Sequence, residues 1–155
     1  MTELRFYHLL SQSLDQALPV FLTKALSAGS RVVVRVPDEG EAERLNTHLW
    51  AWRSDSFLPH GSSKDGFASD QPIYLTEHDE NPNNADVLIL THGVQSESVE
   101  GYRLCCDFFD GGDESAVLAA RQRWKAVSVL GFDLTYWIQN EQGGWNKKEI
   151  VGKSG

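Results

Sequence analysis

Hydrophobic positions along the chain alternate between short β-branched runs and stripes at helical spacing. Residues 31–36 read Arg-Val-Val-Val-Arg-Val, which is typical of a strand covered on both faces and placed centrally in a parallel sheet. Apolar residues between Leu14 and Leu26 recur every three or four positions, so we expect an amphipathic helix that ends near Gly29. This alternation indicates βαβ units and a layered α/β domain.

The remaining elements follow from the same patterns. Further strands are expected at 4–9, 73–76, 87–90, 102–109 and 132–138, and further helices at 37–52 and 114–130. Residues 54–71 are rich in Ser, Gly, Asp and Pro, which predicts a long surface loop. The sequence therefore predicts a Rossmann-like three-layer α/β/α fold with a mainly parallel sheet, formed by one domain at 1–139. The Gly- and Lys-rich residues 140–155 are expected to form a flexible C-terminal tail.

Composition narrows the class of protein. The 155 residues suffice for one domain, and 14 Lys and Arg against 22 Asp and Glu give a net charge of -8 that disfavours a protein coating DNA. The first residues lack the pattern of a signal peptide, and no apolar stretch reaches the ~20 residues of a membrane helix, so we expect a cytoplasmic protein. Cys105 and Cys106 are adjacent and unsuited to a disulfide with each other, which fits a reducing compartment.

Patterns for catalysis are missing. The first strand-to-helix turn, Leu9-Leu-Ser-Gln-Ser-Leu14, contains no Gly, and neither G-x-G-x-x-G nor G-x-x-x-x-G-K-[ST] occurs in the chain. The histidines lack the spacing of zinc ligands. Four acidic residues could in principle hold a metal ion or form an acid/base pair, although such runs are usually solvated turns and helix starts. These four are Asp107, Asp110, Asp113 and Glu114. The missing motifs disfavour dinucleotide and triphosphate binding, and the acidic residues are expected to be solvated and not to bind a metal ion.

The helix at 114–130 carries two apolar arcs. The first is predicted to face the sheet and contains Leu118, Ala119, Ala126, Val129 and Leu130. The second, which contains Val117, Ala120, Arg121, Trp124, Lys125 and Ser128, is then the outer face. An aromatic ring beside two cations suits a short peptide that is both apolar and acidic. In the alternative, which the helical wheel alone favours, Trp124 packs under the last strand and the cations cover it.

A second group of large apolar residues includes Leu49, Trp50, Trp52 and Phe57. These side chains either form an interface hot spot or cover the edge of the core, and the pattern leaves both readings open.

Three segments together resemble the chi subunit family of bacterial DNA polymerase III holoenzyme. They are Phe-Tyr-His-Leu in the first strand, A-E-R-L-N-T-H-L-W-A-W-R-S-D-S-F-L-P-H at 42–60, and R-x-R-W-K-A-V-S-V-L-G-F in the last helix. The likeness runs from Leu4 to about Ile138. It implies a non-enzymatic, clamp-loader-associated subunit with no cofactor, which acts in DNA replication. It also implies two partners, the acidic C-terminal tail of single-stranded DNA-binding protein and a psi subunit or helicase.

Carried over residue by residue, the resemblance puts tail binding at Val117, Arg121, Trp124 and Lys125, with Trp124 where a Tyr is common. This reverses the preference of the helical wheel. Val117 and Ser128 stand where some members of the family carry cations, which implies weaker or less salt-sensitive binding. The surface for the psi or helicase partner would contain Trp50, Phe57 and Pro59.

Two other functions remain as alternatives. One is a nucleotide-binding or helicase-like α/β enzyme that has lost its phosphate loop, which the fold alone suggests. The other is direct binding of single-stranded DNA by stacking on Trp50, Trp52 or Trp124, which the negative net charge disfavours.

Overall fold

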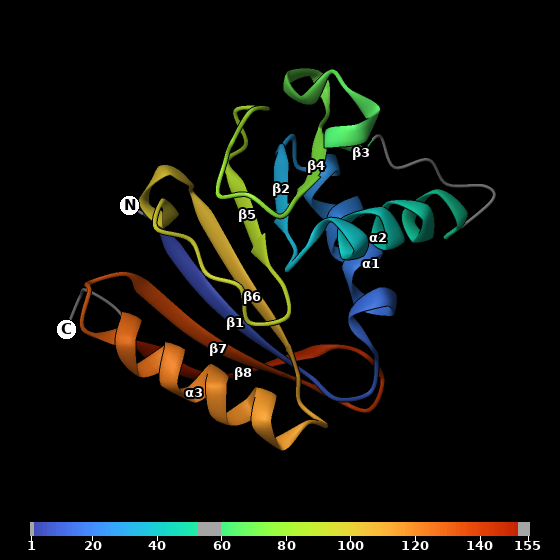
Figure 1. The fold of residues 1–155 in the computed structure, drawn as a ribbon. Helices are drawn as coiled ribbons and strands as arrows, with labels where there is room; N and C mark the ends of the chain where they lie inside the picture. The colour runs from blue at the N-terminus through green and yellow to red at the C-terminus, as the bar shows by residue number, and fades with distance from the viewer. Residues whose placement is uncertain (1, 53–59, 152–155) are drawn as a thin grey trace.

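The computed structural model describes residues 2–52 and 60–151, which form one twisted sheet with helices on both faces (Figure 1). The strands are β1 (Glu3–Leu9), β2 (Val32–Arg35), β3 (His60–Ser62), β4 (Ile73–Thr76), β5 (Val87–Leu90), β6 (Leu104–Asp110), β7 (Asp133–Gln139) and β8 (Trp145–Val151). The α-helices are α1 (Leu14–Ser27), α2 (Glu39–Ala51) and α3 (Glu114–Ser128). Three single 3-10 turns are η1 (Ser63–Asp65), η2 (Ala68–Asp70) and η3 (Val99–Gly101).

The strand order is β3-β4-β2-β5-β6-β1-β7-β8. All neighbouring strands pair in parallel except β7 and β8, which are antiparallel. Helices α1 and α2 cover one face of the sheet and α3 covers the other (Figure 1). The predicted Rossmann-like three-layer fold with a mainly parallel sheet is therefore confirmed. The β-branched run lies centrally as predicted, because β2 is fully buried between β4 and β5.

Each face of the sheet has its own core. Alternate residues of β2, Val32 and Val34, pack toward α1 and α2, while Val33 packs toward the α3 side. This follows from the alternation of side chains along a strand. On the α3 side the core includes Leu4, Phe6, Leu88, Phe109, Ala120 and Leu134. Helix α3 is therefore held on the sheet by apolar burial from β1, β5, β6 and β7.

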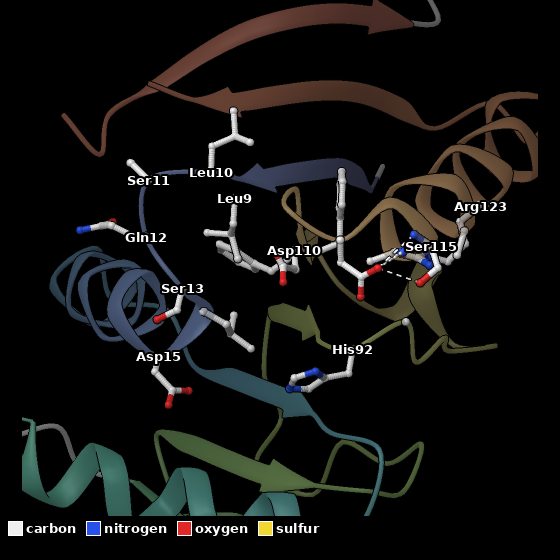
Figure 2. A pocket seen from close by; sticks show the side chains of 17 residues that line it. Leu9, Leu10, Ser11, Gln12, Ser13, Asp15, His92, Asp110, Ser115 and Arg123 are labelled. Atoms are coloured by element: carbon white, nitrogen blue, oxygen red, sulfur yellow. Dashed lines mark hydrogen bonds between the residues drawn. The ribbon is translucent and has the colours of Figure 1, made fainter. Parts of the chain in front are cut away.

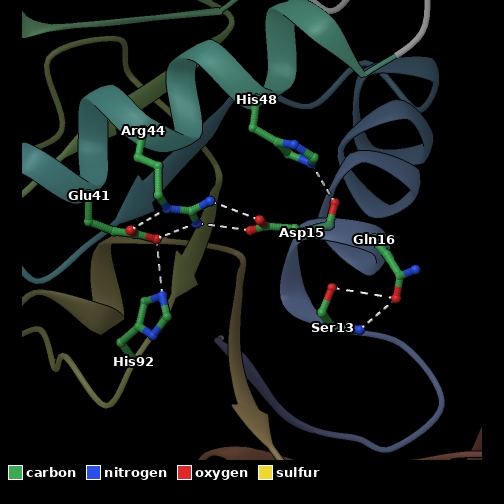
Figure 3. Close-up of polar contacts among 7 residues, drawn as sticks. All are labelled: Ser13, Asp15, Gln16, Glu41, Arg44, His48 and His92. Carbon is green, nitrogen blue, oxygen red and sulfur yellow. Dashed lines mark hydrogen bonds and ion pairs between the residues drawn. The ribbon is translucent and has the colours of Figure 1, made fainter.

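Helix α1 contains a proline at its sixth position. Pro19 has no N–H, so the Asp15 carbonyl, four residues earlier, loses its usual helical donor. The ring of His48 in α2 supplies a hydrogen bond instead, with Nε2 at 2.7 Å from that oxygen (Figure 3). The helix continues through Pro19 because a neighbouring helix satisfies the carbonyl.

Two segments differ from the sequence-based predictions. The predicted loop at 54–71 contains the edge strand β3 and the turns η1 and η2, while 53–59 lie outside the described residues. The segment predicted to be a flexible tail contains β8, which pairs with β7. Asn140 closes the connecting turn, since its side chain accepts a hydrogen bond from the Gly144 N–H at 2.9 Å. Trp145 then packs edge-on against Tyr7, with ring centroids 4.8 Å apart.

The cysteines lie on β6 and both are buried as free thiols. The pKa values of Cys105 and Cys106 are raised, mainly because both thiols are buried. Their low thiolate content makes them poor nucleophiles. Within residues 2–52 and 60–151, no helix is both long and apolar enough to span a bilayer.

Candidate partner-binding surfaces

Helix α3 is rotated relative to its predicted orientation. Leu118, Val129 and Leu130, expected to face the sheet, are 58%, 82% and 63% exposed. Ala120 is fully buried, and Val117, Trp124 and Val127 pack against the core on this face. The predicted core side is therefore wrong. The rings of Phe6 and Tyr136, which pack edge-on against Trp124 on this face, explain the outcome.

Trp124 is half-buried in an aromatic cluster. Its ring meets Phe6 edge-on with centroids 5.4 Å apart and meets Tyr136 of β7 in the same manner at 5.5 Å. Trp124 therefore packs against β7, as in the alternative in which it lies under a C-terminal strand. Its neighbours Arg121 and Lys125, which precede and follow the buried ring, remain exposed. We call Val117, Arg121, Trp124 and Lys125 the α3 surface.

Arg121 differs from the other described arginines. Six of them donate hydrogen bonds to carboxylates or carbonyl oxygens, namely Arg5, Arg31, Arg35, Arg44, Arg103 and Arg123. Within the described part of the chain, the guanidinium of Arg121 has neither a hydrogen bond nor an ion pair. Lys125, one turn further along α3, likewise has no side-chain hydrogen bond or ion pair among these residues. The α3 surface therefore presents two cations whose charge is not neutralised within the described fold.

The charge of Arg121 acts on His8, which belongs to β1, together with the charge of Lys148 in β8. His8 of β1 places Nδ1 at 2.7 Å from the Tyr136 hydroxyl. Burial, with smaller contributions from the nearby charges of Arg121 and Lys148, lowers the pKa of His8 below its usual value. No sequence spacing links these residues, since they are brought together by the pairing of β1, β7 and β8.

The second predicted surface is described only in part. Trp50 lies at the end of α2, is 53% exposed, and contacts the ring of His60 with centroids 4.4 Å apart. His60 is buried in β3 and its Nε2 lies 3.2 Å from the carbonyl of Asn46. Phe57 and Pro59 lie outside the described residues.

A cavity of about 770 Å³ lies at the carboxyl ends of β1 and β6 (Figure 2). This is the edge of the sheet at which open α/β folds commonly bind ligands. Its wall includes the Gly-free turn after β1, His92 and the start of α3. Two acidic side chains of this wall form hydrogen bonds with the backbone. Asp110 accepts a hydrogen bond from Gly112 N at 2.8 Å, and Asp113 accepts one from Ser115 N at 3.0 Å. Asp113 thereby caps α3.

Arg123, which also lines this cavity, belongs to a buried ion pair. Arg123 of α3 donates two hydrogen bonds to Asp107 of β6, at 2.7 and 2.9 Å. Burial raises the pKa of Asp107, against the opposing effect of Arg123. Three of the four acidic residues considered for metal binding, Asp107, Asp110 and Asp113, therefore stabilise the fold through hydrogen bonds. Among residues 2–52 and 60–151, no group of three or more His, Cys, Asp or Glu side chains is arranged to hold a metal ion.

The fold and its surfaces define a Rossmann-like α/β domain in which exposed cations flank a half-buried tryptophan. Residues 1–135 match the family model described as the DNA polymerase III chi subunit, HolC. The chain belongs to this family, as its sequence resemblance indicates. Members of the family are non-catalytic accessory subunits of DNA polymerase III, in agreement with the expectation that the chain is not an enzyme.

Two curated relatives support this assignment. The chain is 33% identical over 90 residues to the probable DNA polymerase III subunit chi of Rickettsia prowazekii, a match that covers 58% of this chain and 54% of that protein. It is 31% identical over 108 residues to DNA polymerase III subunit chi of Escherichia coli, covering 69% of this chain and 73% of that protein. The aligned part thus spans about half of the first relative and about three quarters of the second.

Proposed function

We propose that this chain is an accessory, clamp-loader-associated subunit of DNA polymerase III that acts in the cytoplasm during DNA replication. In this role it binds the acidic C-terminal tail of single-stranded DNA-binding protein through Val117, Arg121, Trp124 and Lys125. The observation that carries the proposal is the guanidinium of Arg121, which is exposed on α3 and has no partner among residues 2–52 and 60–151, while the other described arginines are engaged.

Charge and geometry both favour an acidic peptide. Arg121 and Lys125 lie one helical turn apart, so a peptide with several carboxylates could pair with both. Arg is the better bidentate donor, and its planar group is suited to a carboxylate. The net charge of -8 repels an acidic partner from the protein as a whole, so the two unneutralised cations make this surface selective for it. The apolar parts of Val117 and Trp124 lie beside the cations and could contact an apolar residue of the same peptide.

A second partner, a psi-like subunit or a helicase, is proposed for the end of α2. The supporting observation is the exposure of Trp50, since aromatic residues are enriched in interface hot spots. The proposed surface also includes Phe57 and Pro59, taken from the family resemblance. In this account the chain reaches single-stranded DNA indirectly, through its protein partner.

Fluorescence anisotropy tests the tail-binding proposal. A labelled peptide that copies the acidic, Phe-ending tail is titrated with the wild type, with Arg121→Ala and with Lys24→Ala. Lys24 is an exposed cation on α1, on the opposite face of the sheet, and serves as a control for net charge. We expect micromolar binding that Arg121→Ala weakens about tenfold and Lys24→Ala leaves within about twofold. Equal affinity for all three proteins would refute the proposal.

A further inference from the structure

Strand β8 lies beyond residues 1–135, the part of the chain that matches the family. It forms the edge of the sheet next to β7, on the side of the molecule where α3 lies (Figure 1). The strand is anchored at its start, since Trp145 packs against Tyr7 and against Phe108, at 4.8 and 6.4 Å between ring centroids. Residues that β8 presents therefore have a defined position relative to the sheet.

A β-bulge separates two consecutive lysines of β8. Trp137 of β7 pairs with Lys147, whereas the preceding Tyr136 pairs with Glu149, so Lys148 is the extra residue. Bulges commonly redirect a side chain next to a binding site. The Nζ of Lys147 lies 5.1 Å from the centroid of the Trp137 ring, a cation–π contact. Trp137 packs against the core on the α1 side, which places Lys147 on that face.

Lys148 lies in the bulge opposite Tyr136 and Trp137, and the ring of Tyr136 contacts both His8 of β1 and Trp124 of α3. His8 follows Phe6 by two residues in β1, so both point toward the α3 side of the sheet. The nearby charges of Arg121 and Lys148 both contribute to the lowered pKa of His8. Gly111 makes room for this arrangement, because a methyl group at that position would overlap the His8 ring. Helix α3 and the bulge at Lys148 thus meet at Tyr136 of β7.

We propose that Lys148 extends the α3 surface, so that one acidic peptide contacts Arg121 and Lys125 with some of its carboxylates and Lys148 with another. This inference rests on the proposed function and adds a determinant of affinity outside the part of the chain that matches the family. The partner it fits is a peptide with at least three carboxylates, long enough to pass from α3 to β8. Cations within about 10 Å of a bound carboxylate act on it together at moderate ionic strength.

The two neighbouring lysines provide a matched experiment. Lys148→Gln and Lys147→Gln remove the same charge from adjacent positions of one strand, and Lys147 lies over Trp137 on the α1 side. Each variant of the full chain is titrated with the labelled acidic, Phe-ending peptide at low and at moderate salt, beside the wild type and Arg121→Ala. We expect Lys148→Gln to weaken binding about three- to fivefold and to reduce its salt dependence. Lys147→Gln should change the affinity less than about twofold. Thermal unfolding of both variants verifies that they are folded.

The outcomes separate the two proposals. If Arg121→Ala weakens binding but the two lysine variants bind alike, the extension to β8 is wrong and the α3 surface stands. If the wild type does not bind the peptide at low salt, both proposals fail. If Lys148→Gln alone weakens binding and Arg121→Ala does not, the site is centred on β8 and the proposed extension of an α3 site is overturned.

Discussion

The indole of Trp124 meets the ring of Phe6 edge-on, with 5.4 Å between the ring centroids. Together with Tyr136, this contact fixes α3 to β1 and β7. Trp124 therefore determines where Arg121 and Lys125 are presented, since both are attached to the helix that it anchors. The same residue stabilises the fold and positions the cations of the α3 surface.

Replacing Trp124 is expected to reduce stability. Trp124→Ala leaves a gap next to Phe6 and Tyr136 and should lower the free energy of unfolding by about 2–3 kcal/mol, less than for a fully buried Trp. Trp124→Phe keeps an aromatic contact and should cost less than about 1.5 kcal/mol. Urea denaturation followed by circular dichroism measures both values. A loss below about 0.5 kcal/mol for Trp124→Ala would contradict an anchoring contact.

An ion-pair network near the start of α1 predicts a pH-dependent stability. Arg44 of α2 donates to Asp15 at 2.8 and 2.9 Å and to Glu41 at 2.7 and 2.8 Å (Figure 3). The hydrogen bonds from Arg44 are the main cause that lowers the pKa of Asp15 and of Glu41. Carboxyl groups with lowered pKa values stabilise the fold above their unfolded pKa, and this contribution is lost as the pH falls through the folded values.

Arg44→Met should therefore destabilise the protein by about 1 kcal/mol at pH 7, since the pairs are partly exposed, and by less at pH 3. Chemical denaturation at the two pH values provides the comparison. Lys64→Met is the control, because Lys64 pairs with Glu39 at 3.1 Å with both side chains exposed and should show no measurable loss. An equal loss at both pH values for Arg44→Met would show that packing, and not charge, is responsible.

Binding of an acidic peptide should depend on the protonation of His8. The Tyr136 hydroxyl and the backbone of Gly111 lie next to its ring, and its pKa is lowered by burial first and then by the charges of Arg121 and Lys148. A bound carboxylate would offset the cations and raise the pKa of His8 in the complex. Binding then takes up a proton, so the affinity should rise about two- to fourfold from pH 8 to pH 6.

His8→Gln should remove most of this rise, while His78→Gln, at an exposed turn, should retain it. Anisotropy titrations at pH 6, 7 and 8 make the comparison. The same pH dependence in wild type and His8→Gln would exclude His8 as the titrating group.

Strands and helices could largely be predicted from the sequence because their patterns are local. The β-branched run at 31–36 has the pattern of a buried strand, and the stripe from Leu14 to Leu26 has the spacing of a helix. The corresponding observed elements begin and end within a few residues of the predicted ones. The face of α3 that packs against the sheet cannot be predicted in this way. Apolar residues occur on both of its sides, and the side that packs is decided by Phe6 and Tyr136, which are remote in the sequence.

The C-terminal strand and the proline in α1 show the same limit. The bulge at Lys148 breaks the period of two that identifies a strand, and the burial of Trp145 depends on Tyr7 at the other end of the chain. Pro19 is tolerated through His48, which lies 33 residues from the carbonyl it satisfies. Of the predicted site residues, Arg121 and Lys125 are exposed as expected, whereas the position of Trp124 beneath them depends on tertiary packing.

A charge-reversal cycle tests the central claim, that Arg121 pairs with a carboxylate of an acidic peptide. Wild type and Arg121→Glu are each titrated with the acidic, Phe-ending peptide. Both are also titrated with a set of peptides, in each of which a different carboxylate residue is replaced by Lys. We expect Arg121→Glu to weaken binding of the acidic peptide more than tenfold, and at least one Lys-substituted peptide to recover affinity for Arg121→Glu while losing it for the wild type. Additive effects for every substituted peptide, with no recovery, would contradict the claim.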